Sequence, residues 1–575
     1  MKELLIGNHS IARGLYEGGL RFISGYPGTP STEILEHAAT FPDVECEWAP
    51  NEKVALEAVF GASLAGARAA CTCKHVGQNV AADPLFTFSY TGVGGGAVIC
   101  VADDPAMHSS QNEQDSRHYA IAAKLPMLEP SDSGEALAFA KAAFALSEQF
   151  DTPVLLRTCT RIAHSQSLVE LGERQEVELK PYQKQSEKYV MMPAYAKGRH
   201  PVVEERMKAL ASFAEDCPFN RIEWGEKKIG IITSGTCYHY VKEVFGEKVS
   251  VLKLGLINPL PRELILTFSK EVERLIVIEE LDGIIEAHCN CLGLFPEGKS
   301  LFSPIGELSQ RAIRQALLEE VPPLHNAPAL PARPPMMCSG CPHRGLFYVL
   351  SKHHLTVFGD IGCYTLGAVP PLSSLDTCLC MGASISSLHG CLKVRPEMAQ
   401  QAVAVIGDST FVHSGITSLI DMTYNQTNGT VIILDNAITG MTGHQPNPTT
   451  GYTIKGELST QVDVEALCRS VGVSSIQVVD PYDLSACDHA IKKALGEEQV
   501  SVIILRRPCV LLKTVEKRPP LFVDTTSCKG CMRCMSMGCP SLSVKNGKAQ
   551  IDATLCVGCK VCQQLCPFSA IIDEG

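Results

Sequence analysis

The sequence predicts an α/β protein of several domains, each built on a largely parallel sheet, followed by a small cysteine-rich α+β domain. Two observations lead to this prediction. Short apolar runs such as VICVAD and PVLLRTC alternate with Ala-rich helical stretches, an order typical of βαβ units. Eight of the 26 cysteines then fall between Cys528 and Cys566, close to the C-terminus.

The composition narrows the class of protein. A chain of 575 residues is too long for a single hydrophobic core, and 45% hydrophobic with 19% charged residues is typical of a globular protein. A net charge of −12 without any dense Lys/Arg run disfavours a nucleic-acid partner. We find no signal peptide and no stretch of about 18 apolar residues, so we expect a cytoplasmic protein without a membrane partner.

The alternation of strands and helices divides the chain into successive segments. Residues 1–170 form a first α/β unit, and the polar residues 171–225 look like a connecting excursion over the surface. The α/β rhythm restarts in residues 226–320 and again in residues 336–515, where AVAVIGD, TVIILDN and SVIILRR are expected strands. The proline-dense VPPLHNAPALPARPP between these two units predicts an extended linker. Residues 522–575 form the cysteine-rich tail.

The tail contains two Cys-x2-Cys-x2-Cys runs, each followed by a Cys-Pro pair. The second run has the spacing of two-cluster ferredoxins, in which the cysteine before proline ligates the other cluster, and the first run has one extra residue before its last cysteine. We therefore expect two [4Fe–4S] clusters, one held by Cys528, Cys531, Cys534 and Cys566, and one held by Cys556, Cys559, Cys562 and Cys539. Paired zinc knuckles are the alternative, but a zinc ion closes with four ligands. The tail predicts a protein that transfers single electrons.

The third α/β unit contains a candidate site for a diphosphate and a divalent cation. An apolar strand ends in Gly407 and Asp408, and small residues open the next helix, which is a favourable place for an anion and its metal. Asn436 follows the next strand 28 positions later. We expect Asp408, Asn436 and the main-chain carbonyl of Ile438 to bind one Mg²⁺. An ordinary strand–helix turn is the alternative.

This Gly-Asp…Asn pattern resembles the motif that binds thiamine diphosphate, from which Ser409 and Asp435 depart. The cofactor also needs a carboxylic acid against N1′ of its aminopyrimidine ring. Glu52, at a loop-to-helix junction in WAPNEKVALEA, is the candidate. Its alternative role is that of a charge favoured by the helix dipole.

Several longer motifs are similar to those of one enzyme family. These are GYPGTPSTEI, NEKVALEAVFGASLAGARA, KHVGQNVAADPL, ADDPAMHSSQNEQDSR, CSGCPHRG, GDIGCYTLG and the GDS…DN block. They occur in the order seen in the large subunits of indolepyruvate-type enzymes among the 2-oxoacid:ferredoxin oxidoreductases, and the resemblance extends through nearly the whole chain. It implies transketolase-like domains that bind thiamine diphosphate: a pyrimidine-binding domain at 1–170, a transketolase C-terminal-like domain at 226–320 and a diphosphate-binding domain at 336–515.

The resemblance also implies roles for single residues. Glu52 becomes the activating acid, and the loop Tyr26, Pro27, Gly28 and Thr29 lines the cleft for cofactor and substrate. The other cofactor-binding residues are expected to be Gly362, Cys363, Gly407, Asp408, Ser409, Asn436 and Ile438. Relatives acting on pyruvate bind the substrate carboxylate with an arginine where this chain has Asp103 and Asp104. That role stays open here, with Thr29, Lys74, His75 and Arg117 as candidates.

The implied reaction is the oxidative decarboxylation of an aryl pyruvate, namely indolepyruvate, phenylpyruvate or hydroxyphenylpyruvate. The products are CO2 and the aryl-acetyl thioester of coenzyme A, and the electrons leave to an external ferredoxin. A small β subunit is the implied partner, in an αβ or α2β2 assembly. Two alternatives remain open. One is the same chemistry on pyruvate or a branched-chain oxoacid, and the other is an electron-transfer subunit with a degenerate thiamine site, which Ser409 alone supports.

The motif CSGCPHR raises the question of a third cluster. Related oxidoreductases hold a [4Fe–4S] cluster near the cofactor with a Cys-x-x-Cys pair, a Gly-Cys loop and a late Pro-Cys. The corresponding residues here are Cys338, Cys341, Cys363 and Cys509, with Cys378 or Cys380 as an alternative fourth ligand. A zinc site and a reduced structural pair are the competing interpretations.

Overall fold

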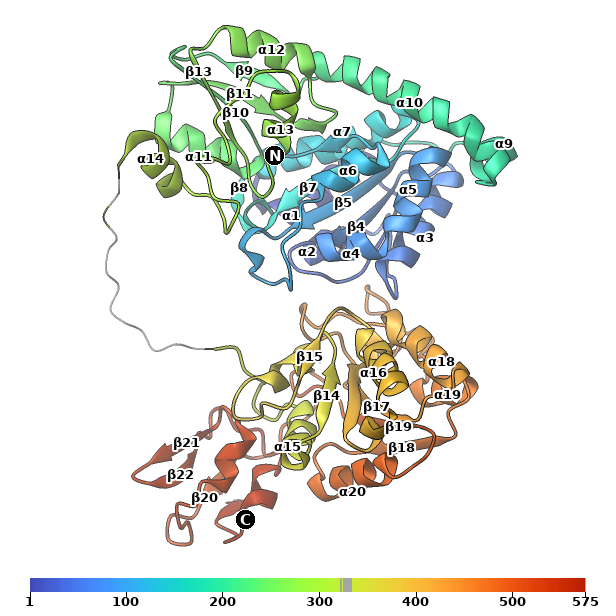
Figure 1. The fold of residues 1–575 in the computed structure, drawn as a ribbon, viewed down its shortest axis with the longest axis vertical. Coiled ribbons are helices and arrows are strands. Elements are labelled where there is room, and N and C mark those ends of the chain that lie inside the picture. Colours follow the sequence, from blue (N-terminus) through green and yellow to red (C-terminus); the bar gives the residue numbers. More distant parts are fainter. Residues whose placement is uncertain (321–322, 324–333, 574–575) are drawn as a thin grey trace. The chain divides into compact units, whose positions relative to one another are not determined.

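The computed structural model describes residues 1–320, 323 and 334–573. By its contacts the chain divides into two compact units, Met1–Asn326 and Ala327–Gly575 (Figure 1). The five segments expected from the sequence thus group into two bodies. The expected proline-rich linker lies almost entirely outside the described residues.

The first unit is organised around a seven-stranded sheet in the order β12-β6-β7-β5-β4-β2-β3. Neighbouring strands are parallel except β12, which is antiparallel to β6. The central strands β4, β5 and β7 are buried at every position, as expected for a parallel sheet covered on both faces. The strands are β2 (Phe22–Gly25), β3 (Glu45–Trp48), β4 (Ala69–Lys74), β5 (Ala97–Asp103), β6 (Met127–Leu128), β7 (Val154–Cys159) and β12 (Leu256–Asn258).

Helices follow these strands in the alternation that the sequence predicts. Asn51 and Asp132 cap α3 and α7 by accepting hydrogen bonds from the main-chain N–H groups of Val54 and Glu135. A short strand pair, β1 (Lys2–Ile6) with β8 (Gln166–Glu170), closes the first segment. The helices are α1 (Gly7–Glu17), α2 (Thr32–Ala38), α3 (Glu52–Leu64), α4 (His75–Val80), α5 (Ala82–Thr91), α6 (Arg117–Ala123), α7 (Ser133–Phe150) and α8 (Thr160–His164), with the 3₁₀ turn η1 (Pro105–Met107).

The polar segment 171–225 contains a regular element that we did not expect. Besides α9 (Ser186–Tyr189), it forms the 23-residue helix α10 (Pro193–Glu215), which packs against α5, α7 and α12. Its buried residues follow helical spacing and are Val203, Arg206, Leu210 and Ala214. Such a narrow stripe produces no apolar run in the sequence, so the helix resembled a surface connection.

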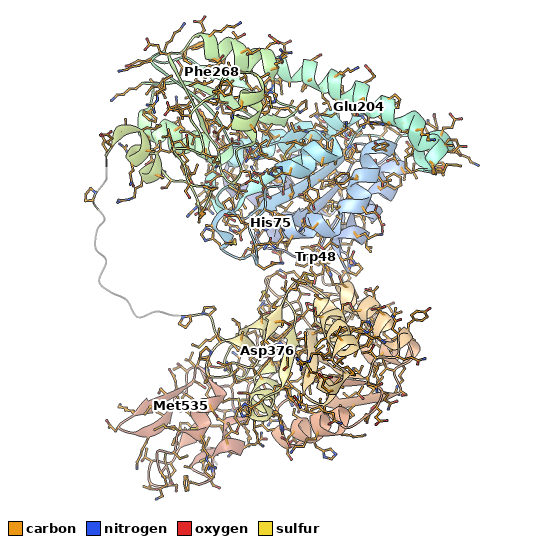
Figure 2. The ribbon with its side chains drawn as sticks, viewed as in Figure 1. Trp48, His75, Glu204, Phe268, Asp376 and Met535 are labelled. Atoms are coloured by element: carbon orange, nitrogen blue, oxygen red, sulfur yellow. The ribbon has the colours of Figure 1, made fainter. Side chains whose placement is uncertain are left out.

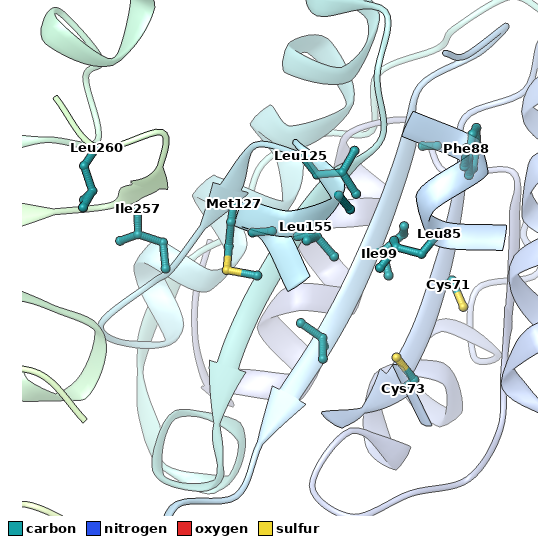
Figure 3. Close-up of a cluster of buried hydrophobic side chains, with 14 of the residues drawn as sticks. Cys71, Cys73, Leu85, Phe88, Ile99, Leu125, Met127, Leu155, Ile257 and Leu260 are labelled. Carbon is teal, nitrogen blue, oxygen red and sulfur yellow. The ribbon is translucent and has the colours of Figure 1, made fainter. Parts of the chain in front are cut away.

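A second, four-stranded sheet completes the first unit, in the order β13-β10-β11-β9. Its core is continuous with that of the first sheet, because Ile232, Leu252 and Val277 of its strands belong to one buried cluster with Met127 and Leu155, which Figure 3 shows. The strands are β9 (Arg221–Glu223), β10 (Ile229–Ser234), β11 (Ser250–Leu254) and β13 (Arg274–Ile278), and the helices are α11 (Gly235–Phe245), α12 (Arg262–Lys270), α13 (Ile284–Cys291) and α14 (Gln310–Leu318).

The second unit contains a six-stranded, fully parallel sheet in the order β15-β14-β16-β17-β19-β18. Alternate residues of its strands pack against α15 and α20 on one face and against α16, α18 and α19 on the other. The strands are β14 (Thr356–Gly359), β15 (Thr377–Cys378), β16 (Ala402–Gly407), β17 (Gly429–Asp435), β18 (Ser475–Val479) and β19 (Val500–Arg506). The helices are α15 (His343–His353), η2 (Cys363–Ala368), α16 (Ala383–Val394), η3 (Pro396–Gln400), α17 (Asp408–Thr410), the π-helical turn η4 (Phe411–Gly415), α18 (Ile416–Tyr424), α19 (Val464–Ser470) and α20 (Leu484–Leu495).

The cysteine-rich tail packs onto this α/β domain. Met537 and Val561 of the tail belong to the same buried cluster as α15 and α20, which gives this small domain additional core. The tail consists of two antiparallel strand pairs, β20 (Leu521–Val523) with β23 (Ile571–Asp573) and β21 (Leu542–Lys545) with β22 (Lys548–Ile551), and the short helices η5 (Arg533–Met537) and η6 (Cys562–Leu565). In the described parts of the chain, no helix is long and apolar enough to cross a membrane.

Candidate active site

Three oxygen-bearing groups meet at the carboxyl edge of the sheet of the second unit. Asp408 directly follows β16 and Asn436 directly follows β17, and parallel strands bring these two positions to the same edge. One side-chain amide atom of Asn436 lies 3.2 Å from Asp408 Oδ1 and 2.9 Å from the carbonyl oxygen of Ile438. All three residues are buried.

The chemistry of these groups fits a divalent cation. In one orientation the Asn436 amide donates hydrogen bonds to both oxygens, and in the other its own oxygen faces them, so that three oxygens converge without a hydrogen between them. Carboxylate, amide and main-chain oxygens are the ligands that Mg²⁺ and Ca²⁺ take. Burial, together with the nearby carboxylate of Asp435, raises the pKa of Asp408 to about 7. A bound cation favours the ionised carboxylate.

Ser409, which stands where the thiamine-diphosphate motif usually has glycine, is accommodated by the surrounding loop. The hydroxyl of Ser409 accepts a hydrogen bond of 3.0 Å from Thr439. Gly407 and Gly362 both lie against the ring of Tyr364, since a Cβ at these positions would be 2.8 Å and 2.2 Å from its Cε1 atom. Gly362 and Gly407 therefore leave room for the Tyr364 ring to pack beside the candidate cation site.

Two residues beside this site were not singled out from the sequence. His343 is buried, and its Nε2 lies 3.5 Å from Asn436 Nδ2. Thr449 donates a 3.1 Å hydrogen bond to Asp408 Oδ2. His343 belongs to the CSGCPHR motif, so the sequence offered a reason to select it. Thr449 lies in a loop without such a motif.

The first unit contains the candidate acid. Glu52 begins α3 and is only 5% exposed. Its carboxyl group lies on α4, because a Cβ at Gly77 would be 2.2 Å from Glu52 Oε1. Glycine at position 77 therefore makes the space that the Glu52 side chain occupies.

Lys74 lies close to the same group. It is the last residue of β4, is buried, and donates a 3.0 Å hydrogen bond from Nζ to the carbonyl of Ser109. Burial lowers its pKa to about 8, against the opposing effect of the carboxylates of Asp104 and Glu52. A Cβ at Gly28 would lie 3.3 Å from Lys74 Cγ. The structure thus brings Lys74 together with the Tyr26–Thr29 loop.

His75 is engaged by the main chain. His75, which is labelled in Figure 2, begins α4, and its Nε2 lies 3.2 Å from the carbonyl of Asn112. Burial lowers its pKa, so the imidazole is neutral at pH 7. A neutral ring already bonded to the backbone is a weak candidate for a carboxylate ligand.

Arg117 does not lie in an open cleft, contrary to what a substrate-binding role requires. It is fully buried and bonded to Asp115 at 2.6 Å and Glu279 at 2.5 Å, and it also donates to the main-chain carbonyls of Glu280 and Asp282. Its guanidinium therefore links the two sheets of the first unit and has little capacity left for a substrate.

Asp103 and Asp104, where relatives acting on pyruvate are expected to have arginine, also have structural partners. Asp103 pairs with the buried Arg157 at 2.7 Å. Asp104 accepts hydrogen bonds from Ser110 and Thr160, each at 2.7 Å.

The cysteines of the tail line two cavities. The first cage, as we call it, consists of Cys528, Cys531, Cys534 and Cys566. The second cage consists of Cys539, Cys556, Cys559 and Cys562. These are the two sets that the spacing predicts, each taking its Cys-Pro cysteine from the other run.

Main-chain N–H groups point at several of these sulfurs. Leu521 N lies 3.4 Å from Cys556 Sγ, and Ala570 N lies 3.3 Å from Cys566 Sγ. N–H groups of Gly530 and Ala549 lower the pKa of Cys528. Such donors stabilise thiolates that ligate a cluster. Within residues 1–320, 323 and 334–573, no group of three or more His, Cys, Asp or Glu side chains is arranged around a single metal position.

The structure also brings together the four cysteines of a third cage. Cys509 and Cys338 lie near enough to Cys363 to raise its pKa, and Cys338 and Cys363 do the same to Cys341, whose N–H also donates a 3.1 Å hydrogen bond to the carbonyl of Cys338. We define the third cage as these four residues. Burial raises the pKa of Cys341, Cys363 and Cys509.

The alternative fourth ligands lie in a different environment. Cys378 and Cys380 are exposed and interact electrostatically with Asp360 and not with the cysteines of the third cage. Cys509 also connects the third cage to the candidate cation site, because its N–H donates a 2.9 Å hydrogen bond to the carbonyl of Asn436.

Comparison with known proteins identifies three domain families. The thiamine-diphosphate-binding domain of pyruvate flavodoxin/ferredoxin oxidoreductases matches residues 13–215, and the C-terminal domain of thiamine pyrophosphate enzymes matches residues 360–505. A 4Fe-4S binding domain matches residues 549–572. The predicted class of parallel-sheet domains with a ferredoxin tail is confirmed.

Curated relatives match over the whole length. The indolepyruvate oxidoreductase subunit IorA of Archaeoglobus fulgidus is 39% identical over 610 residues, which cover 99% of this chain and 97% of the relative. IorA of Thermococcus kodakarensis is 39% identical over 633 residues, covering 100% and 98%. The 2-oxoglutarate synthase subunit KorA of A. fulgidus is 26% identical over 320 residues, covering 49% of this chain and 88% of the relative.

Proposed function

This chain belongs to the family of the indolepyruvate oxidoreductase subunit IorA, and from this membership we propose that it oxidises aryl pyruvates. The family assignment establishes a thiamine-diphosphate-dependent 2-oxoacid:ferredoxin oxidoreductase with iron–sulfur electron transfer. The proposal concerns the substrate. The observation that carries it is the full-length match to IorA, whereas KorA matches only about half of this chain.

The proposed reaction converts an aryl pyruvate and coenzyme A into CO2 and an aryl-acetyl thioester. The carbon–carbon bond to the carboxylate breaks, a carbon–sulfur bond forms, and one proton and two electrons are released. The electrons reduce two molecules of a one-electron ferredoxin. A small partner subunit completes the enzyme, as the naming of its relatives as subunits implies.

We propose that Asp408, Asn436 and the carbonyl of Ile438 hold Mg²⁺ and that Gly362, Cys363, Gly407 and Ser409 lie against the diphosphate. When bound, thiamine diphosphate supplies the electron sink for decarboxylation. The convergence of oxygens around Asn436 supports the cation site. We assign to Glu52 the proton held at N1′ of the aminopyrimidine ring. Its buried carboxyl group, placed by Gly77, supports this role.

Among the four candidates for the substrate carboxylate, we favour Lys74 with Thr29 beside it. With a pKa of about 8 it is mostly cationic at pH 7, and desolvation makes its charge a strong partner for a carboxylate. Arg117 is committed to Asp115 and Glu279.

We further propose three [4Fe–4S] clusters, one in each cage. Support for the third is the grouping of Cys338, Cys341, Cys363 and Cys509 apart from Cys378 and Cys380. An iron–sulfur cluster supplies one-electron transfer when bound. The cysteines and the N–H groups around them are the contribution of this chain.

The test of the substrate is a comparison of initial rates. The chain is co-expressed anaerobically with its small subunit, and methyl viologen reduction is followed with coenzyme A and indolepyruvate, phenylpyruvate, hydroxyphenylpyruvate or pyruvate. We expect the aryl pyruvates to have the higher kcat/KM. Preference for pyruvate would mean the alternative substrate. Absence of thiamine diphosphate from the purified complex would favour the electron-transfer subunit with a degenerate site.

A further inference from the structure

The two cages of the tail differ in what surrounds them. The cavity of the second cage is lined in part by Gly340, Cys341 and Arg344, which belong to the α/β domain of the same unit. Among the described residues, the lining of the first cage comes from residues 523–571 of the tail. The second cage therefore faces the interior of the unit and shares Cys341 with the third cage. The first cage is the one left for another protein.

Hydrogen bonds fix the tail in this orientation. Arg344 donates 2.9 Å and 2.6 Å hydrogen bonds to the carbonyls of Met537 and Gly538. Gln564 donates a 2.7 Å hydrogen bond to the carbonyl of Tyr482, whose own hydroxyl donates to the carbonyl of Gly340. The tail is thus held on both sides of the second cage.

The surface around the first cage is cationic although the whole chain carries a net charge of −12. Residues 522–550 contain four cationic side chains and one carboxylate, whereas residues 551–575 contain one cationic side chain and three carboxylates. We define the cationic face as Lys529, Arg533, Lys545 and Lys548.

Contacts place three of these residues around the cage, and Arg533 is an exposed residue at the start of η5, between Cys531 and Cys534 in the sequence. Lys529 lines the cavity itself. Lys548 donates a hydrogen bond from Nζ to the carbonyl of Thr525, three residues before Cys528. The turn between Lys545 and Lys548 packs on the cysteine loop, because a Cβ at Gly530 would be 2.4 Å from the carbonyl oxygen of Gly547.

An apolar centre accompanies the charges. Cys531 is exposed, Phe568 lines the same cavity and is 44% exposed, and Val544 of the neighbouring hairpin is 51% exposed. A small apolar centre with a mainly cationic rim, in which Asp524 is the one carboxylate of residues 522–550, is suited to weak, electrostatically steered encounters.

We propose that an acidic one-electron carrier docks on this cationic face and takes electrons from the first cage. The inference rests on the proposed function and adds the exit site and the sign of the partner's charge. A [4Fe–4S] cluster bound by the first cage would supply one electron to the oxidised carrier at each encounter, so two encounters would follow each 2-oxoacid oxidised. The chemistry that recognises the carrier is a surface of carboxylates around its own cluster.

The test compares two double charge reversals in the complete complex with its small subunit. Arg533→Glu with Lys545→Glu changes two exposed positions of the cationic face and leaves Lys529 in the cavity wall. The matched control, Lys393→Glu with Arg395→Glu, makes the same change at two exposed positions of the α16 end. Binding of an oxidised, acidic one-cluster ferredoxin is measured by titration calorimetry at low and high salt, which requires no turnover.

We expect Kd for the ferredoxin to rise about tenfold in the Arg533/Lys545 variant at low salt, with a weaker salt dependence, and to be unchanged in the control. Reduction of methyl viologen by the 2-oxoacid is expected to stay the same in both. Equal ferredoxin affinity in the two variants overturns the docking site, as does loss of the small subunit from the Arg533/Lys545 variant. Failure of every complex, including the unchanged one, to reduce methyl viologen instead counts against the proposed function.

Discussion

Replacing Gly77 by alanine tests whether the position of the Glu52 carboxyl group matters for catalysis. Gly77 lies in α4, and an added Cβ would be 2.2 Å from Oε1, 2.7 Å from Cδ and 2.8 Å from Cγ of Glu52. An ordinary contact between nonbonded carbon atoms is about 3.5–4.0 Å. The substitution therefore has to move the acid while leaving its chemistry intact.

The size of the effect follows from this overlap. Restoring an ordinary contact requires the carboxyl group to move by roughly 1 Å, and a misplacement of that size costs about 100-fold in rate. Overpacking a buried site costs about 1–3 kcal/mol of folding stability, partly offset by the better helix propensity of alanine, worth about 0.5–1 kcal/mol. The variant should therefore fold but turn over slowly.

The assay is kcat for indolepyruvate-dependent methyl viologen reduction, measured together with the thermal unfolding midpoint. The control is Gly61→Ala in α3, the helix that Glu52 begins, because nothing lies within 4 Å of a Cβ there. We expect about a 100-fold loss for Gly77→Ala, a similar or larger loss for Glu52→Gln, and full activity for Gly61→Ala. A Gly77→Ala enzyme with nearly unchanged kcat would show that catalysis does not depend on the position of the Glu52 carboxyl group.

Three further predictions concern the other groups of the site. Lys74 has a lowered pKa of about 8, so its side chain is cationic below that pH and neutral above it, and kcat/KM for the aryl pyruvate should fall as pH rises through about 8. The Lys74→Met variant should have a lower kcat/KM at pH 7 and should lose this fall above pH 8. Asp408→Asn should weaken Mg²⁺-dependent binding of thiamine diphosphate by about 10–100-fold, measured by fluorescence titration, because the cation loses its charged ligand; unchanged affinity would exclude Asp408 as a ligand. Iron analysis should give twelve atoms per chain, and Cys509→Ser should disturb the third cage while the EPR signals of the other two clusters persist; eight atoms in the unchanged protein would contradict a third cluster.

Local features of the site could be predicted from the sequence because they depend on chain spacing. The two cysteine sets follow from the interval between consecutive cysteines, and Asp408 and Asn436 each follow an apolar strand of a parallel sheet. In such a sheet, neighbouring strands end at the same edge, so the meeting of the two side chains needs little tertiary information.

Long-range partners could not be predicted in this way. The partner of Arg117, Glu279, lies 162 positions away, and a single arginine gives no sign of burial. The space that Gly77 leaves for Glu52 likewise depends on how α4 packs against α3. The helix α10 was missed because only a narrow stripe of its residues is buried.

The most direct test of the account is the stoichiometry of the products in one closed reaction. The complete complex is incubated anaerobically with indolepyruvate, coenzyme A and oxidised ferredoxin, and the thioester is quantified by mass spectrometry alongside the absorbance of the ferredoxin. We expect indole-acetyl-coenzyme A, with two one-electron equivalents of ferredoxin reduced per thioester. Reduction of ferredoxin by pyruvate but not by indolepyruvate, or release of CO2 without any thioester, would contradict it.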